Sequence, residues 1–408
     1  MKDSREPLLF YCQHSLGMGH LVRSLALAAP LAERFRVVLL NGGKLPKGLA
    51  VPEGVEVVNL PPLGLDPEGR LVSRDGRRTA ERAKELRRAQ ILETYRRLRP
   101  GVVLVELFPF GRKKFAGELL PLLEEARAER ARRPLVVCSL RDILVGKRAE
   151  QQKHDARAAE TANRYFDAVL VHSDPAFARL DESLGSYGQL AVPVHHTGFV
   201  LPEKGPANDE AAGVGRQILV SAGGGLVGET LLRTAVAAYP LLRETEAVTM
   251  KVVAGPFLPE GAWRSLRESA GRLRGLSVRR FVPDLCAEMR RSAASVSQCG
   301  YNTALDILRA GVPALVVPFA EGGEDEQLKR ARRLERLGAL RVAERHELDP
   351  ARLARGLREL LAFRPRPTEL EMRGGQNSAR LIESLLRSRT SRAAAASRGR
   401  HAAREAQA

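Results

Sequence analysis

The chain has 408 residues, of which 44% are hydrophobic and 28% are charged. This composition is that of a globular protein with two or three domains, and it excludes a fibrous or wholly disordered chain. No apolar run reaches the ~18 residues that a membrane-spanning helix needs. The apolar segment 8–12 is too short for the core of a signal peptide. We therefore expect a cytoplasmic protein.

The cysteine pattern predicts no metal site. The four cysteines form no CxxC pair and stand at unrelated spacings, so neither a zinc site nor a disulfide framework is expected. Buried thiols in a reducing compartment are the simplest interpretation. The four are Cys12, Cys138, Cys286 and Cys299.

The net charge of +18 is concentrated in two segments. Residues 77–99 contain nine basic and three acidic residues, and residues 387–408 contain six arginines and one glutamate. A basic patch attracts nucleic acid, anionic lipid or a phosphorylated substrate. Nucleic acid is the least favoured of these partners, because stacking on bases needs aromatic residues and Tyr95 is the only one in segment 77–99. A solvated helix face with a disordered tail is an equal alternative.

Short β-rich runs alternate with long amphipathic stretches, which is typical of βα units and parallel sheets. The alternation breaks at a segment rich in Pro, Gly and charge, and then restarts with a similar strand and glycine-rich turn. We predict an α/β fold with two similar Rossmann-like lobes. The expected parts are a first lobe at 1–201, a linker at 202–215, a second lobe at 216–365, a C-terminal helix at 366–387 and a disordered basic tail at 388–408.

A glycine-rich loop follows the first strand of each half. Glycine lets the backbone approach a ligand closely, and the start of the next helix offers free N–H groups to an anion. Both loops therefore predict phosphate binding. Their residues are Gly17, Gly19 and His20 in the first loop and Gly223, Gly224, Gly225 and Gly228 in the second.

The usual nucleotide cofactors are disfavoured. A dinucleotide site needs an acidic residue at the end of the second strand. The two halves instead carry Asn41-Gly42-Gly43 and Ala254-Gly255-Pro256 there. No GKS or GKT follows either glycine run, so a Walker A loop is absent as well.

The segment 281–331 carries the most informative pattern. A strand at 293–297 leads through Gly300 into a helix that bears Thr303 and Asp306. The carboxylate of Asp306 could accept bonds from both hydroxyls of a ribose. Asp325 and Gln327, in the loop after the next strand, could bind the hydroxyls of a sugar.

This pattern resembles the donor-binding half of GT-B glycosyltransferases. It is most similar to the MurG-like glycosyltransferase family 28, the N-acetylglucosaminyltransferases that act on lipid-linked muramyl peptide. The family pattern is SGA-x-T-x-x-E, then AAGxP, then VP with a D-x-Q loop. It is matched by 299–306, 310–313, Pro318, Asp325 and Gln327. Asp306 replaces the glutamate of the family, and Arg330 replaces an asparagine beyond its Gln.

The resemblance implies the GT-B architecture, with two Rossmann-like lobes facing a cleft and the C-terminal helix crossing back to the first lobe. It implies a UDP-sugar donor, a hydroxyl acceptor, inversion by direct displacement, no cofactor and no tightly bound metal. The position whose backbone reads the uracil corresponds to Val282. The donor-binding residues implied are Gly17, Gly19, Gly223, Gly224, Gly225, Val282, Gly300, Thr303, Asp306, Asp325 and Gln327.

Two residues are candidates for the catalytic base. His20 begins a helix that faces the expected cleft, and an imidazole suits proton abstraction at neutral pH. Asp142 lies at the carboxyl end of a predicted strand, where sites of α/β proteins gather. The acceptor motif HEQNxxxG of the family is only loosely echoed by 139–146, so the acceptor is not predicted. Segment 77–99 is expected to serve the acceptor side, near a phosphorylated acceptor or an anionic membrane at its inner face.

Two other functions remain open. A sugar-nucleotide epimerase or hydrolase of the same architecture would convert the donor without an acceptor. A basic nucleic-acid-binding protein is the less favoured alternative.

Overall fold

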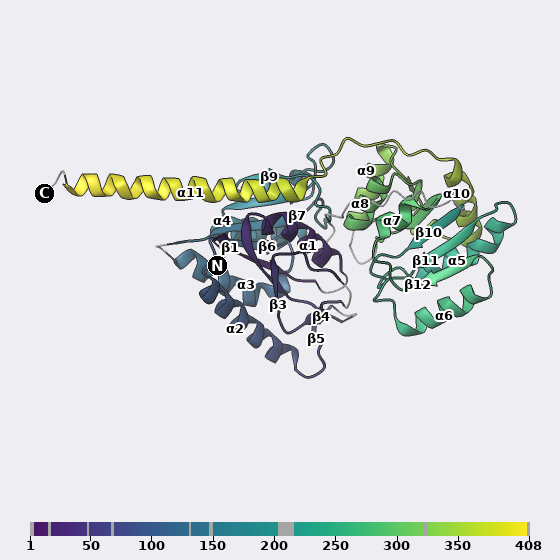
Figure 1. Cartoon of the computed structure of the whole chain (residues 1–408), viewed down its shortest axis with the longest axis horizontal. Helices are drawn as coiled ribbons and strands as arrows, with labels where there is room; N and C mark the ends of the chain where they lie inside the picture. Colours follow the sequence, from purple (N-terminus) through teal and green to yellow (C-terminus); the bar gives the residue numbers. More distant parts are fainter. Residues whose placement is uncertain are drawn as a thin grey trace.

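The computed structural model describes residues 4–14, 18–46, 49–66, 69–129, 132–146, 150–202, 216–320 and 325–405. It contains two α/β lobes, each with a parallel sheet between helices (Figure 1). The predicted linker falls almost entirely outside the described residues, as does Gly17.

The N-terminal lobe is built on a seven-stranded sheet in the order β3-β2-β1-β6-β7-β8-β9. All of its strand pairs are parallel. The central strands are buried on both faces, which explains why they read as continuous apolar runs. Its strands are β1 (Glu6–Cys12), β2 (Phe35–Asn41), β3 (Val55–Asn59), β6 (Val102–Glu106), β7 (Leu135–Arg141), β8 (Ala168–His172) and β9 (Val194–His196).

The helices of this lobe cover both faces of the sheet (Figure 1). A small antiparallel pair that the sequence analysis did not anticipate, β4 (Leu63–Leu65) and β5 (Leu71–Ser73), precedes the second helix. The helices are α1 (Gly19–Ala32), α2 (Ala80–Leu98), α3 (Ala116–Ala128) and α4 (Gln151–Tyr165).

The C-terminal lobe has a six-stranded sheet in the order β12-β11-β10-β13-β14-β15, again with parallel pairs. Its strands are β10 (Gln217–Ser221), β11 (Thr249–Val253), β12 (Leu276–Arg279), β13 (Ala294–Ser297), β14 (Ala314–Val316) and β15 (Arg341–Val342). Its helices are α5 (Glu229–Arg243), α6 (Glu260–Gly271), α7 (Leu285–Arg290), α8 (Tyr301–Ala310), α9 (Glu326–Arg336) and α10 (Pro350–Ala362).

The order of strands reverses at the first strand of each lobe. In the N-terminal lobe β1 lies between β2 and β6, and in the C-terminal lobe β10 lies between β11 and β13. Ligands of open α/β sheets bind at such a reversal, beyond the carboxyl ends of the strands. Both glycine loops follow these two strands, so the fold places each loop where a ligand site is expected.

The last helix, α11 (Gly374–Glu405), returns to the N-terminal lobe and packs on α1 (Figure 1). Ala379 and Ile382 are fully buried in that contact. The helix differs from the expectation at both ends. It begins at Gly374, later than the expected residue 366.

At its far end α11 continues to Glu405, through most of the segment expected to be disordered. This segment is rich in alanine and arginine, which have high helix propensity. The low complexity of the sequence led us to expect disorder there. The high helix propensity of alanine and arginine accounts for the helix.

Candidate functional site

The glycine loop after β10 is shaped by close contacts that exclude side chains. Gly223 and Gly225 have φ values of 56° and 90°, in the left-handed region that favours glycine. A Cβ atom on Gly225 would lie 2.5 Å from the carbonyl oxygen of Ala254. The carbonyl of Gly224 accepts a hydrogen bond of 3.0 Å from the N–H of Phe257. The loop is therefore held against the end of β11.

The same loop lies beside the start of α8. A Cβ atom on Gly223 would be 4.0 Å from Oγ1 of Thr303. Gly300 is the N-cap of α8 and has open space around it. Thr303 and Asp306 are three residues apart and so share one side of this helix. Thr303 is buried and Asp306 is half-buried. The structure thus brings together four of the predicted donor-site residues.

Gln327, at the start of α9, faces the same turn. Its Oε1 atom accepts hydrogen bonds from the backbone N–H of Cys299, at 3.1 Å, and of Phe319, at 3.3 Å. These bonds fix the amide plane beside Gly300. The amide nitrogen has no hydrogen-bond partner within the described residues, so it can donate to a ligand.

Asp325 lies differently from the expectation, whereas the position of Val282 leaves its expected role open. Oδ1 of Asp325 accepts a hydrogen bond of 3.1 Å from the N–H of Gly146, which belongs to the other lobe, and the side chain is buried. Its Oδ2 lies 2.8 Å from Nζ of Lys329. In this arrangement Asp325 joins the lobes and does not face a sugar. Val282 packs partly buried against the core, next to the half-exposed ring of Phe281.

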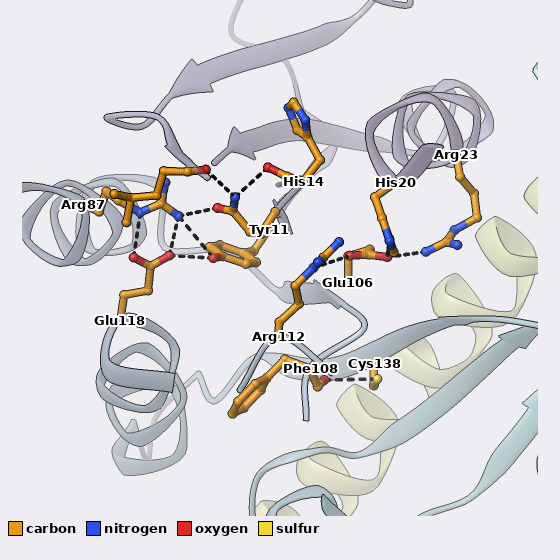
Figure 2. A network of polar contacts seen from close by, with 12 residues as sticks. Tyr11, His14, His20, Arg23, Arg87, Glu106, Phe108, Arg112, Glu118 and Cys138 are labelled. Atoms are coloured by element: carbon orange, nitrogen blue, oxygen red, sulfur yellow. Dashed lines mark hydrogen bonds and ion pairs between the residues drawn. The ribbon is translucent and has the colours of Figure 1, made fainter. Parts of the chain in front are cut away.

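A histidine and a glutamate form a close pair in the N-terminal lobe. Nδ1 of His20, at the start of α1, lies 2.6 Å from Oε1 of Glu106, at the end of β6. Arg23 donates to the same oxygen, and Nε of Arg112 lies 3.8 Å from Oε2 (Figure 2). Glu106 is fully buried, whereas the His20 side chain keeps 20% of its exposure. The pair can therefore be reached by a ligand only at the imidazole.

Electrostatics keep this imidazole neutral and this carboxylate charged. Burial and, after it, the positive charge of Arg112 lower the pKa of His20 to about 3, despite the opposing effect of Glu106. Burial opposes the charge of Glu106, but His20, Arg23 and Arg112 outweigh it and hold the pKa of Glu106 well below its usual range. Because Glu106 accepts at Nδ1, the lone pair of His20 is at Nε2.

Asp142 is not available as a base, which corrects the sequence-based expectation. Nε and Nη2 of Arg330 donate to its two carboxylate oxygens at 2.6 and 2.7 Å. Both residues are buried, with exposed fractions of 1% for Asp142 and 2% for Arg330. A carboxylate held on both oxygens and closed to solvent cannot accept a proton from an acceptor hydroxyl.

The first glycine loop meets the start of α8 through a contact between the lobes. Nδ2 of Asn302, in the first turn of α8, donates a hydrogen bond of 3.1 Å to the carbonyl oxygen of Gly19. His20 follows Gly19 directly. The start of α1, with the histidine, and the start of α8, with the predicted donor residues, are therefore neighbours where the two lobes meet.

Sequence reasoning missed Glu106. It lies at the carboxyl end of a predicted strand, which is the same signal that selected Asp142. What separates the two is the partner of each carboxylate. Glu106 contacts a histidine 86 residues away, and Asp142 contacts an arginine 188 residues away.

The basic segment 77–99 forms α2, and its cations are less available than their number indicates. Arg87 is fully buried: it lies 2.5 Å from Glu118 and donates at 2.7 Å to the carbonyl oxygen of Gly42 (Figure 2). Four further ion pairs are Arg78–Asp75, Arg82–Glu85, Lys84–Glu81 and Arg96–Glu125. Four exposed arginines have no ion pair within the described residues: Arg77, Arg88, Arg97 and Arg99.

The described part of the chain holds no cluster of three or more His, Cys, Asp or Glu residues placed to bind a metal ion. Among the same residues no helix is both long and apolar enough to cross a membrane.

Comparison with known sequences finds a family match for the C-terminal lobe. Residues 220–386 match the glycosyltransferase family 28 C-terminal domain. A Bordetella parapertussis protein is 29% identical over 349 residues, which are 83% of this chain and 85% of that protein. An Alkalilimnicola ehrlichii protein is 29% identical over 218 residues, which are 48% of this chain and 59% of that protein. Both are named UDP-N-acetylglucosamine–N-acetylmuramyl-(pentapeptide) pyrophosphoryl-undecaprenol N-acetylglucosamine transferase.

Comparison with solved structures confirms the expected GT-B architecture. MurG of Acinetobacter baumannii superposes with a TM-score of 0.55 at 17% identity, covering 93% of this chain and 99% of that chain. The calicheamicin glycosyltransferase CalG4 superposes with a TM-score of 0.56 at 16% identity, covering 94% of this chain and 95% of that chain. Each likeness extends over both lobes.

Proposed function

We propose that this chain, a glycosyltransferase of the GT-B fold with a family 28 C-terminal domain, moves a hexosyl group from a UDP-sugar to an acceptor hydroxyl. The observation that carries the proposal is the meeting of the Gly223–Gly225 loop with Thr303 and Asp306 at the reversal of the sheet. Transfer proceeds by a single displacement, which needs one base and no covalent intermediate on the enzyme. A single displacement inverts the configuration of the anomeric carbon.

The donor is bound by the C-terminal lobe. Backbone N–H groups of the glycine loop and of the start of α8 bind the diphosphate, since the first turn of a helix has N–H groups without helical partners and the helix dipole favours an anion. Asp306 accepts bonds from the ribose hydroxyls. The backbone at Val282 reads the uracil beside the ring of Phe281, and Gln327 donates to the sugar. The names of the two relatives make UDP-N-acetylglucosamine the first donor to test.

His20 acts as the general base. Its Nε2 takes the proton of the acceptor hydroxyl while the oxygen of that hydroxyl attacks the anomeric carbon. Glu106 keeps the ring in the correct tautomer and stabilises the imidazolium that forms, as a carboxylate does in other histidine-based sites. UDP leaves on the other side of the carbon, toward the N–H groups of α8, which stabilise its growing negative charge.

The diphosphate also prepares the base. A pKa of about 3 leaves His20 neutral but weakly basic, and a base works best when its pKa is close to the working pH. A diphosphate bound across the Gly19–Asn302 contact adds negative charge next to the imidazole, which favours the imidazolium and raises the pKa of His20. Binding of the donor thereby makes His20 a stronger base.

The acceptor approaches from the N-terminal lobe. We place the basic segment 77–99, with its exposed Arg77, Arg88 and Arg97, near an anionic surface, at the inner face of a membrane. Lys and Arg near such a surface each contribute about 1 kcal/mol. The ion pairs of the other cations of α2 leave a small number of free charges, so the attachment is weak and reversible.

Release of UDP from UDP-N-acetylglucosamine tests this function. The protein is incubated with the donor alone and with lipid and aqueous extracts of cells, and the His20→Ala variant serves as the control. A transferase releases UDP only when an extract supplies an acceptor. Release without any extract would indicate a hydrolase, and a changed sugar on intact UDP-sugar would indicate an epimerase.

A further inference from the structure

Tyr301 joins the start of the donor helix α8 to the opposite lobe. Its hydroxyl donates a hydrogen bond of 3.0 Å to the carbonyl oxygen of His172 and accepts one of 3.0 Å from the N–H of Val200. Both partners belong to the N-terminal lobe, and the tyrosine is buried. Both hydrogen-bonding roles of the hydroxyl are thus used between the lobes.

The ring of Tyr301 lies near two guanidinium groups, one from each lobe. Arg23 of α1 is 5.5 Å from the ring centroid and Arg330 of α9 is 5.9 Å from it. Such contacts are attractive because the ring face is electronegative. Arg23 also donates to Glu106, which orients His20. Three successive contacts, through Arg23 and Glu106, therefore connect the tyrosine to the base.

Arg330 continues this chain of contacts back into the N-terminal lobe. It holds both oxygens of Asp142 and donates at 2.8 Å to the carbonyl oxygen of Cys299, just before the N-cap of α8. A buried ion pair gains little net energy, because both charges lose their hydration. A bidentate pair does fix geometry. Its main effect here is to set how the two lobes dock.

We propose that Tyr301, Arg330 and Asp142 form a coupling unit between the lobes that positions the His20–Glu106 pair against the donor helix. These are positioning residues, because none of them contacts the predicted donor or acceptor positions. The effect of this unit on catalysis rests on the proposed function. The docking of the lobes around His20 does not depend on that function. Arg330 also stands where the family pattern has an asparagine.

The pKa of His20 depends on how the two lobes dock. Glu106, Arg112 and Arg141, all from the N-terminal lobe, are the charged groups that act on it. Glu106 and Arg112 stay beside His20 when the lobes separate, whereas Arg141 also loses its ion pair with Glu326 of α9. The C-terminal lobe shields His20 from solvent, because Asn302 contacts the neighbouring Gly19. Loss of docking therefore hydrates His20 without removing its charged neighbours, and its pKa rises toward 6.5.

The experiment compares two coupling variants with two matched controls. Tyr301→Phe removes both hydroxyl bonds and keeps the ring, and Asp142→Asn removes the charge and keeps the shape. Tyr239→Phe is the control for the first, since the hydroxyl of Tyr239 is buried and donates at 3.0 Å to the carbonyl oxygen of Arg274 within one lobe. Glu118→Gln is the control for the second, since Glu118 pairs with the buried Arg87 within one lobe.

The readout is the titration of His20 by NMR, assigned with a His20→Gln sample, together with the radius of gyration from X-ray scattering. We expect the His20 pKa to rise by about one unit or more in both coupling variants, with a larger radius, and to stay unchanged in both controls. UDP affinity should stay within about threefold in the coupling variants, because the donor residues are intact.

Two results would overturn the coupling unit. One is a His20 titration and radius that match the unmodified protein in both coupling variants. The other is an equal shift in the controls, which would mean that any loss of stability moves His20. If Asp142→Asn does not fold, the double variant with Asp142→Asn and Arg330→Gln is used in its place, because it removes both charges of the buried pair. Failure of UDP to bind would contradict the proposed function and leave this titration interpretable.

Discussion

Nδ1 of His20 lies 2.6 Å from Oε1 of Glu106, although the two residues belong to different elements, the start of α1 and the end of β6. The carboxylate is fully buried and also accepts a bond from Arg23. This geometry leaves only Nε2 of the imidazole open to a substrate. It is the arrangement that a histidine base requires, with its orientation fixed on the side away from the reaction.

Removal of the base should reduce turnover more than donor binding. His20→Ala deletes the group that takes the proton, and a positioned base contributes typically about 10²- to 10⁴-fold in rate. Glu106→Gln keeps the hydrogen bond but loses the charge that stabilises the imidazolium, so its turnover should fall as well. Steady-state kinetics with an identified acceptor, and calorimetry with UDP, measure the two effects. Turnover of His20→Ala within a few-fold of normal would exclude His20 as the base.

Binding of UDP should raise the pKa of His20 from its low value. Burial and Arg112 hold that pKa at about 3 in the absence of a ligand, and a diphosphate nearby favours the charged imidazolium. NMR titration of His20 with and without saturating UDP measures the shift. Uridine, which lacks the phosphates, is the control and should leave the titration unchanged. An identical curve with UDP would place the diphosphate away from His20.

Acid should destabilise the protein through its buried histidines. His172 is fully buried between Ser139 and Thr197, and burial, then the charge of Arg23, lowers its pKa to about 3. The unfolded chain binds this proton near pH 6.5 and the folded chain does not. The free energy of unfolding therefore falls as the pH drops from about 6.5 toward 3, by up to about 1.4 kcal/mol per pH unit for this residue.

Denaturant titrations across this pH range measure the slope. His172→Gln removes the titrating group and should flatten the dependence. His346→Gln is the matched control, because the His346 side chain is 74% exposed. An unchanged slope in His172→Gln would assign the acid sensitivity to other groups.

The exposed arginines of segment 77–99 should give weak, salt-sensitive attachment to anionic vesicles. Sedimentation with anionic and neutral liposomes tests a chain truncated after Leu386, which lacks the basic end of α11. The Debye length falls from about 10 Å at 0.1 M salt to about 3 Å at 1 M, so binding should be lost at high salt. Replacement of Arg77, Arg88 and Arg97 by Gln should abolish it, whereas Arg96→Gln, which breaks an existing pair with Glu125, should have little effect. Equal, negligible pelleting everywhere would leave α2 as a solvated surface.

The grouping of the candidate donor residues could be predicted from the sequence because its signals are local. Gly223, Gly225, Thr303 and Asp306 lie within short stretches whose spacing carries the pattern, and the strand-turn-helix context follows from hydrophobic periodicity. The structure then adds only their proximity across the sheet. Asp325 shows the limit of such patterns, since its position matches the family while its carboxylate contacts Gly146 of the other lobe.

The acceptor side could not be predicted in the same way, because its roles depend on contacts between distant residues. Glu106 and Asp142 both end strands and are equal candidates on periodicity alone. Only the fold pairs the first with His20 and the second with Arg330. The buried Arg87 is a similar case, since composition counts it as a surface charge and the structure places it in the core.

Calorimetric titration with UDP tests the central claim most directly, because it asks whether the site on α8 binds the predicted ligand. UDP should bind, and NAD and ATP should not. Asp306→Ala should weaken UDP binding by about 10- to 100-fold, since a hydrogen bond to a charged group contributes roughly 1.5–3 kcal/mol. The matched control Glu359→Ala, an exposed carboxylate on α10, should bind normally. Binding of NAD with no binding of any nucleoside diphosphate would contradict the account.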